Sequence, residues 1–222
     1  MITGDFPRMV CRNQEMYIVK EINPAELERG QVYKLLTGSI VPRAIAWVSS
    51  VSADGTYNLA PFSFFTAASA NPPLILFCPG IRDTDNGRKD SYQNVRTSGE
   101  FVVNFVNAAN AEAMNITAAE LPSDVSEFER AGLTAIPSKM VNVPRVKESP
   151  IHFECKLYQI VDAGDGHIVI GEVVYMHFDE TVFQEGNYID VEAMQPVARL
   201  AGPNYALLHN FFALKRPPSE IK

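Results

Sequence analysis

The sequence predicts a mainly β protein, an antiparallel β-barrel with peripheral helices. Strand patterns outnumber helical patterns along its 222 residues, and strands do not alternate regularly with helices as they do in a doubly wound sheet. The clearest element is a hairpin. Residues 151–157 alternate apolar and polar side chains, and a glycine-rich turn at 162–166 leads into a second strand over 167–178.

The N-terminal half of the chain is expected to supply one helix and the first barrel strands. Asn23 and Pro24 predict the start of a helix that runs to Leu36 and is ended by Gly38. The run 40–51 is rich in β-branched and aromatic residues and predicts a long strand. A turn at Asp54-Gly55 leads to a second strand, and Asn71-Pro72-Pro73 separates it from a third strand at 74–78.

The next segment predicts three helices around one buried strand. Asp90 is a candidate N-cap for a helix through Arg96, which Gly99 ends. A buried strand follows at 100–107, and helices are expected over 107–121 and 123–131, where they would cover one end of the barrel. No repeat or linker divides the chain, so residues 1–222 are expected to form a single domain, with an N-terminal arm at 1–20 and a C-terminal tail at 215–222.

Composition excludes several classes of function. Hydrophobic residues make up 46% of the chain and charged residues 20%, as in ordinary globular proteins. The formal net charge of −7 argues against a nucleic-acid-binding surface, because such a surface needs clustered Lys and Arg. No apolar run approaches the about 18 residues of a membrane span, and the N-terminus lacks the pattern of a signal peptide, so a cytoplasmic protein is expected.

Cysteine and histidine spacing predicts neither a disulfide framework nor a metal site. Cys11, Cys78 and Cys155 are odd in number and share no CxxC spacing, and the histidines are scattered. The sequence also lacks a phosphate loop and a complete Rossmann glycine pattern. Asn115 begins a glycosylation pattern, which we interpret as a chance match because no secretory signal accompanies it.

The segment 38–73 indicates function more strongly than any other. Asn58, Pro61 and Ser63 interrupt a run of apolar residues where an ordinary strand would alternate. Such a mixture suits a wall that contacts a flat, partly polar ligand.

Motifs in this segment and beyond it resemble those of the flavin reductase-like family of FMN-binding split-barrel flavoproteins. The motifs are Pro42-Arg43-Ala44-Ile45-Ala46-Trp47-Val48-Ser49, Asn58-Leu59-Ala60-Pro61-Phe62-Ser63, Arg88-Lys89-Asp90-Ser91, Gly166-His167-Ile168-Val169-Ile170-Gly171-Glu172-Val173 and the run 196–205. Ser91 stands where the family commonly has threonine, and Ala201 where it commonly has glycine. The ordered motifs cover residues 20–212. The resemblance implies a Greek-key antiparallel split barrel that binds FMN.

FMN makes three demands on a protein: a charged phosphate, an apolar ring system, and a pyrimidine edge with donors and acceptors. Taken together with the resemblance, these demands give the following cofactor-binding candidates: Arg43, Ser49, Ser50, Asn58, Ala60, Pro61, Ser63, Arg88, Lys89 and Ser91. Cations, hydroxyl groups and helix amides suit the phosphate and the ribityl chain, whereas the segment 58–63 suits the ring. Outside the motifs' context, each of these residues also fits a solvated loop, a turn or a strand end. Trp47 is expected in the core.

The resemblance implies an oxidoreductase in which bound FMN accepts a hydride from NADH or NADPH and passes electrons to free flavin or another acceptor. Hydride transfer to a flavin needs no protein base, so no catalytic residue is assigned. His167 and His177, at opposite ends of one strand, are candidates to lie near the substrate.

The family also implies a homodimer, in which the N-terminal arm and residues around Tyr188 or Tyr205 would complete the neighbour's site. Two other functions stay open: an electron-transfer flavoprotein that takes electrons from a protein donor, and a barrel that only binds flavin or serves a structural role.

Overall fold

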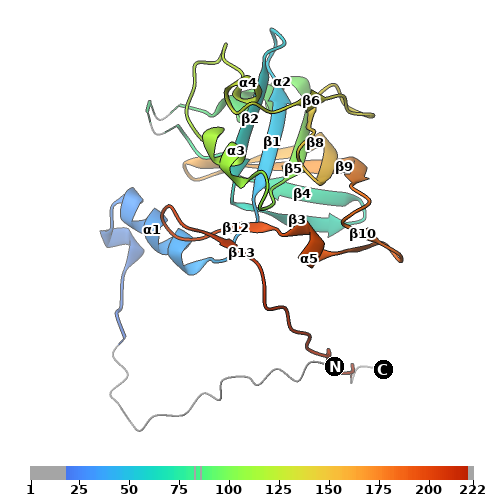
Figure 1. Ribbon diagram of the computed structural model, residues 1–222. Helices are drawn as coiled ribbons and strands as arrows, with labels where there is room; N and C mark the ends of the chain where they lie inside the picture. The colour runs from blue at the N-terminus through green and yellow to red at the C-terminus, as the bar shows by residue number, and fades with distance from the viewer. Residues whose placement is uncertain (1–18, 83, 86, 220–222) are drawn as a thin grey trace.

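The computed structural model describes residues 19–82, 84, 85 and 87–219. Its centre is a strongly curved sheet of seven strands in the order β2-β1-β5-β8-β9-β4-β3, with every neighbouring pair antiparallel (Figure 1). The strands are β1 (Ala46–Val51), β2 (Tyr57–Phe62), β3 (Phe65–Ala70), β4 (Pro73–Phe77), β5 (Glu100–Phe105), β8 (Ile151–Ala163) and β9 (Gly166–Phe178). The prediction of a mainly β fold with peripheral helices is confirmed.

The remaining elements are short and lie around this sheet. The helices are η1 (Pro24–Glu26), α1 (Arg29–Ser39), α2 (Asp90–Ser98), α3 (Ala111–Ile116), α4 (Glu127–Arg130) and α5 (Val191–Met194). Three small antiparallel pairs are formed by β6 (Ala135–Ile136) with β7 (Arg145–Val146), β10 (Phe183–Gln184) with β11 (Tyr188–Ile189), and β12 (Val197–Arg199) with β13 (Tyr205–Leu207). Figure 1 shows α2 and α4 at one end of the sheet, and α1 beside β12 and β13 at the other.

Side chains alternate between the two faces of the sheet along each strand, and at β1 both faces are buried. On β1, Ala46 and Val48 belong to one apolar cluster, which α2 covers with Tyr92 and Val95. Trp47 belongs to a second cluster on the opposite face, under α3 and α4. Trp47 is fully buried and its indole Nε1 donates to the Thr117 hydroxyl at 2.8 Å, so its predicted place in the core is confirmed.

The hairpin of β8 and β9 is the longest paired element. Its turn is Gly164-Asp165, where Gly164 has a φ of 62° that favours glycine. A second glycine, Gly171 on β9, leaves room for the ring of Phe101 on β5. A Cβ at Gly171 would clash with the ring of Phe101, which is fully buried in the first apolar cluster.

Two predictions for the N-terminal half are wrong in their boundaries. The helix predicted from Asn23 to Leu36 is interrupted, because Glu28 forms a capping box with Gln31 and starts α1 anew; Gly38 lies inside α1. The strand predicted from residue 40 begins only at Ala46. Between α1 and β1 the chain makes only an isolated antiparallel bridge, in which Arg43 and Arg199 of β12 exchange backbone hydrogen bonds at 3.0 and 2.9 Å.

Other boundaries also differ from the predicted ones. The second predicted strand is two strands, β2 and β3, and the helices predicted over 107–121 and 123–131 shorten to α3 and α4. The strand that follows Gly99 is confirmed as β5, and Gly99 ends α2 with a φ of 71°. Most of the predicted N-terminal arm lies outside the described residues, and 208–219 contains no helix or strand.

Candidate functional site

A cavity of about 90 Å³ opens between β2, the start of α2 and the residues that follow α3. It brings together three segments that are well separated in the sequence, residues 58–62, 89–91 and 117–121. Five of the ten predicted cofactor-binding residues line it: Asn58, Ala60, Pro61, Lys89 and Ser91.

The start of α2 gives this cavity an end suited to an anion. The helix begins after Lys89, whose extended backbone places it at the N-cap. The first amides of a helix lack acceptors within the helix, and the helix dipole adds partial positive charge there. Asp90, which was predicted as the N-cap, is instead the first helical residue, and its carboxylate accepts from Arg82 Nη1 at 3.4 Å.

Asn58 is held by two hydroxyl groups. Its Nδ2 donates to Ser91 Oγ at 2.8 Å and to Ser50 Oγ at 3.3 Å, and Ser50 also accepts from Asn94 Nδ2 at 3.2 Å. Ser50 lies directly opposite Asn58 in the β1-β2 register and is fully buried. Because both Nδ2 hydrogens are in use, Oδ1 is the polar atom that Asn58 can offer to a ligand. Ser50 therefore positions Asn58 from behind the cavity.

Two cations and three carboxylates line the cavity. The cations are Arg82 and Lys89, and the carboxylates are Asp90, Glu120 and Glu127. Lys89 Nζ forms an ion pair with Glu120 Oε1, while Glu120 Oε2 accepts from the Thr84 amide at 3.3 Å. The positive charge at this end of the cavity is thus partly neutralised by the protein itself.

Glu127 has a structural contact in the cavity wall. It is buried, and its Oε2 accepts from the Leu59 amide at 2.9 Å. Burial raises the pKa of Glu127, as does the nearby Asp90, although the Leu59 hydrogen bond opposes the shift. This carboxylate connects α4 to β2 and fixes the strand that carries Asn58.

Arg43 and Ser63 lie outside this cavity. The guanidinium of Arg43 is buried and donates to the carbonyls of Thr37, Ile40 and Leu200, and its Nε donates to Ser63 Oγ at 3.3 Å. Arg43 therefore connects the end of α1, the start of β1 and the C-terminal β12 region. It also borders a second, mostly apolar cavity of about 270 Å³.

Ser49, another predicted binding residue, is buried on the face of β1 that also carries Trp47. Its hydroxyl donates to the Pro144 carbonyl at 2.6 Å and accepts from Asn104 Nδ2 at 3.2 Å. Asn104 also accepts from the Val146 amide at 2.8 Å. These bonds attach the 137–146 segment to the sheet, and they do not involve the cavity.

Arg88 and His167 both contact the ring of Tyr92, and neither lines the cavity. The guanidinium carbon of Arg88 lies 5.1 Å from the centre of the Tyr92 ring, and the imidazole of His167 stacks on that ring at 4.1 Å. His167 Nδ1 lies 2.8 Å from Asp162 Oδ1. The structure thus places the side chains of Arg88 and His167 against Tyr92 of α2, outside the cavity that Lys89 and Ser91 line.

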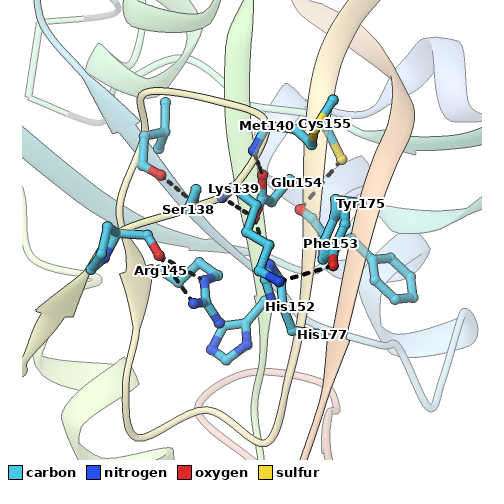
Figure 2. Close-up of polar contacts among 12 residues, drawn as sticks. Ser138, Lys139, Met140, Arg145, His152, Phe153, Glu154, Cys155, Tyr175 and His177 are labelled. Carbon is cyan, nitrogen blue, oxygen red and sulfur yellow. Dashed lines mark hydrogen bonds and ion pairs between the residues drawn. The ribbon is translucent and has the colours of Figure 1, made fainter.

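His177 lies in a separate buried cluster on β8 and β9, shown in Figure 2. Its Nε2 contacts Glu154 Oε1, and the same carboxylate accepts from the amides of Lys139 at 2.8 Å and Met140 at 2.6 Å. Glu154 is fully buried. Burial raises the pKa of Glu154, but these hydrogen bonds outweigh burial and hold its pKa below the ordinary value. His177 therefore helps to attach the 138–143 segment to the sheet.

The two tyrosines predicted to reach a neighbouring subunit differ in environment. Tyr188 is 70% exposed at the small β10-β11 pair. The ring of Tyr205 lies under the Arg199 guanidinium at 4.5 Å, and its hydroxyl donates to Asn115 Oδ1 at 3.2 Å.

The described part of the chain contains no group of three or more His, Cys, Asp or Glu that could hold a metal ion. No helix in that part is long and apolar enough to cross a membrane. Cys78 and Cys155 are free thiols there, and Cys11 lies outside the described residues.

Sequence reasoning missed three charged residues of the cavity: Arg82, Glu120 and Glu127. Arg82 precedes the turn at 85–87, and the two glutamates lie in a stretch where helices were predicted without a role in binding. Their position depends on how the segment after α3 folds back over β2 and α2, and no local pattern encodes that arrangement.

Comparison with protein families finds a match over residues 37–196 to the model described as a flavin reductase like domain. The matched residues include β1 to β9 and the whole lining of the 90 Å³ cavity. The agreement covers the segment in which all ten predicted binding residues lie.

Individual relatives extend over most of the chain. An uncharacterised protein of Aquifex aeolicus is 43% identical over 189 residues, covering 85% of this chain and 93% of its own. The crystal structure of nitrilotriacetate monooxygenase component B from Bacillus cereus is 41% identical with a TM-score of 0.84, covering 89% and 99%. The 2-nitrobenzoate 2-nitroreductase of Pseudomonas fluorescens is 35% identical with a TM-score of 0.82, covering 90% and 100%.

Proposed function

Because the chain belongs to the flavin reductase-like family, we propose that it binds FMN and reduces it with NADH or NADPH, passing the electrons to free flavin or another acceptor. The observation that carries the proposal is the cavity at the start of α2, where a cation, a hydroxyl group and helix amides meet beside an apolar wall. This set of groups fits a phosphate ester attached to a flat ring.

The phosphate would be held by Lys89, Ser91 and the first amides of α2. Arg82 would be the second cation, a role predicted for Arg88, since Arg82 lines the cavity and Arg88 lies over Tyr92. The side of β2 formed by Ala60 and Pro61 would contact the ring, and Asn58 Oδ1 would accept a hydrogen bond from an N–H of the flavin. Ser50 would support Asn58 from outside the cavity, whereas Arg43, Ser49 and Ser63 would have structural roles away from it.

The size of the cavity favours a second subunit. Its volume of about 90 Å³ is well below the ~300–1,000 Å³ of pockets that enclose a small-molecule ligand. One chain would therefore enclose one end of FMN, and a neighbouring chain would cover the rest. We accordingly propose a cytoplasmic homodimer with the flavin near the subunit interface.

The bound flavin would supply the redox chemistry, accepting a hydride from the nicotinamide. The residues of this chain would bind and orient the flavin and shield it from water. Cations would neutralise the phosphate, and Asn58, which Ser50 and Ser91 position, would fix the edge of the ring. No described side chain needs to transfer a proton for this step.

Replacement of Lys89 tests the placement of the phosphate. Lys89→Ala should weaken FMN roughly 10- to 100-fold and riboflavin less than about threefold, because a charge-assisted hydrogen bond contributes ~1.5–3 kcal/mol. Quenching of flavin fluorescence measures both affinities. Lys147→Ala, which removes an exposed lysine outside the cavity, is the matched control. Equal weakening of FMN and riboflavin would show that the phosphate lies elsewhere.

Anaerobic mixing with NADH or NADPH separates the reductase from its alternatives. Rapid loss of the oxidised flavin absorbance at 450 nm supports the reductase, and the faster nucleotide is the preferred one. Persistence of the oxidised spectrum with both nucleotides would favour an electron-transfer flavoprotein. The similarity to a nitroreductase makes 2-nitrobenzoate a third addition to test, since turnover of it with NADH or NADPH would identify a nitroaromatic acceptor.

A further inference from the structure

The ion pair between Lys89 and Glu120 occupies the part of the cavity where the proposed phosphate would bind. Both side chains line the cavity, and they are 27% and 20% exposed. The pair is therefore shielded from water on most sides, where a charge interaction is stronger than at a fully exposed surface.

Glu120 makes the contacts that a ligand anion would make. One carboxylate oxygen contacts Lys89 Nζ, and the other accepts from the Thr84 amide at 3.3 Å. A lysine ammonium and a backbone amide are the usual partners of a bound phosphate. The carboxylate of the protein thus takes the place of an anionic ligand.

A phosphate that reaches Lys89 has to displace Glu120 or share the ammonium with it. Asp90 and Glu127 line the same cavity and carry the same negative charge as Glu120, so they do not stabilise a displaced Glu120. Arg82, the other cation of the cavity, already contacts Asp85 and Asp90. Displacement therefore opposes binding of FMN, and re-formation of the pair favours its release.

We propose that Glu120 is a built-in competitor for the flavin phosphate, which makes FMN an exchangeable substrate of this chain rather than a permanently held group. The inference depends on the proposed function, because it assumes that Lys89 binds the phosphate of FMN. Riboflavin, which lacks the phosphate, is not subject to this competition.

Glu120→Gln tests the proposal, since glutamine keeps the size of the side chain and loses its charge. FMN should bind about 10-fold more tightly and dissociate more slowly, and the affinity for riboflavin should change less than about twofold. Equilibrium fluorescence quenching and stopped-flow dissociation provide the two measurements. Glu129→Gln is the control, because it removes the same charge from an exposed position of α4 outside the cavity.

Combination with Lys89→Met separates competition from general repulsion. If Glu120 competes for Lys89, the effect of Glu120→Gln on FMN should largely disappear in the Lys89→Met background. An undiminished effect there, an equal effect of Glu129→Gln, or unchanged or weaker FMN binding by Glu120→Gln would each overturn the proposal. Failure of the unmodified chain to bind any flavin would instead contradict the proposed function.

Discussion

Acidification from pH 7 to pH 5 should destabilise the folded chain through His152. This residue is 5% exposed, and its Nε2 lies 2.7 Å from the Val146 carbonyl, so the neutral ring donates there. Its Nδ1 is buried with no hydrogen-bond partner among the described residues. Burial lowers the pKa of His152 from 6.5 to about 4, and the positive charge of Arg145 acts in the same direction.

Acidification lowers the free energy of unfolding because the unfolded chain binds the His152 proton more tightly than the folded chain does. The unfolded chain takes up a proton on this histidine near pH 6.5, whereas the folded chain resists it until about pH 4. Stability is therefore full above pH 6.5 and declines as the pH falls toward 4. The whole shift corresponds to ~3.4 kcal/mol, of which about 2 kcal/mol is lost between pH 7 and pH 5. Glu154 adds to the loss only below about its ordinary pKa of 4.5.

Urea denaturation at pH 7 and pH 5 measures this loss as a difference in the free energy of unfolding, at one fixed protein concentration. His152→Gln keeps a donor for Val146 and removes the titration, so it should lose about 2 kcal/mol less than the unmodified chain over this interval. His209→Gln, at an exposed position near the C-terminus, should lose as much as the unmodified chain. If His152→Gln and the unmodified chain lose the same free energy, the burial argument is wrong.

Two further substitutions test the packing around the site. Gly171→Ala should lower the free energy of unfolding by about 2–3 kcal/mol, because its methyl group has to displace the buried Phe101 ring; a loss below about 0.5 kcal/mol in urea denaturation would contradict the close approach. Trp47→Phe should cost about 1–3 kcal/mol through the lost hydrogen bond to Thr117 and reduced packing, yet change FMN affinity less than about twofold; a large loss of affinity would place Trp47 at the flavin.

The strand and turn predictions for the longest hairpin, which depended on short-range patterns, agree with the structure, although the predicted boundaries of the first helix and first strand do not. Alternation of apolar and polar residues located the β8-β9 hairpin, and glycine located its turn. The motif residues Asn58, Lys89 and Ser91 line one cavity although they come from two separate segments. The hairpin and its turn could be predicted because strand periodicity and turn geometry depend on a few neighbouring residues.

Residues whose partners are distant in sequence could not be assigned this way. Arg43 and Ser49 have the donor groups of phosphate-binding residues, but the carbonyls of Leu200 and Pro144 are their partners. His177 was a candidate beside the substrate, and its actual partner is Glu154, 23 residues earlier. A donor in a sequence does not reveal its acceptor, because folding decides which carbonyls and carboxylates come within hydrogen-bond distance.

The sequence by itself determined the mainly β fold class, and its motifs pointed to the family and to a flavin. Only the tertiary structure decided which charges share the cavity, because Glu120 reaches Lys89 through the chain folding back after α3. Strand patterns arise from the periodic burial of neighbouring side chains, whereas an ion pair between residues 31 positions apart depends on the path of the whole chain.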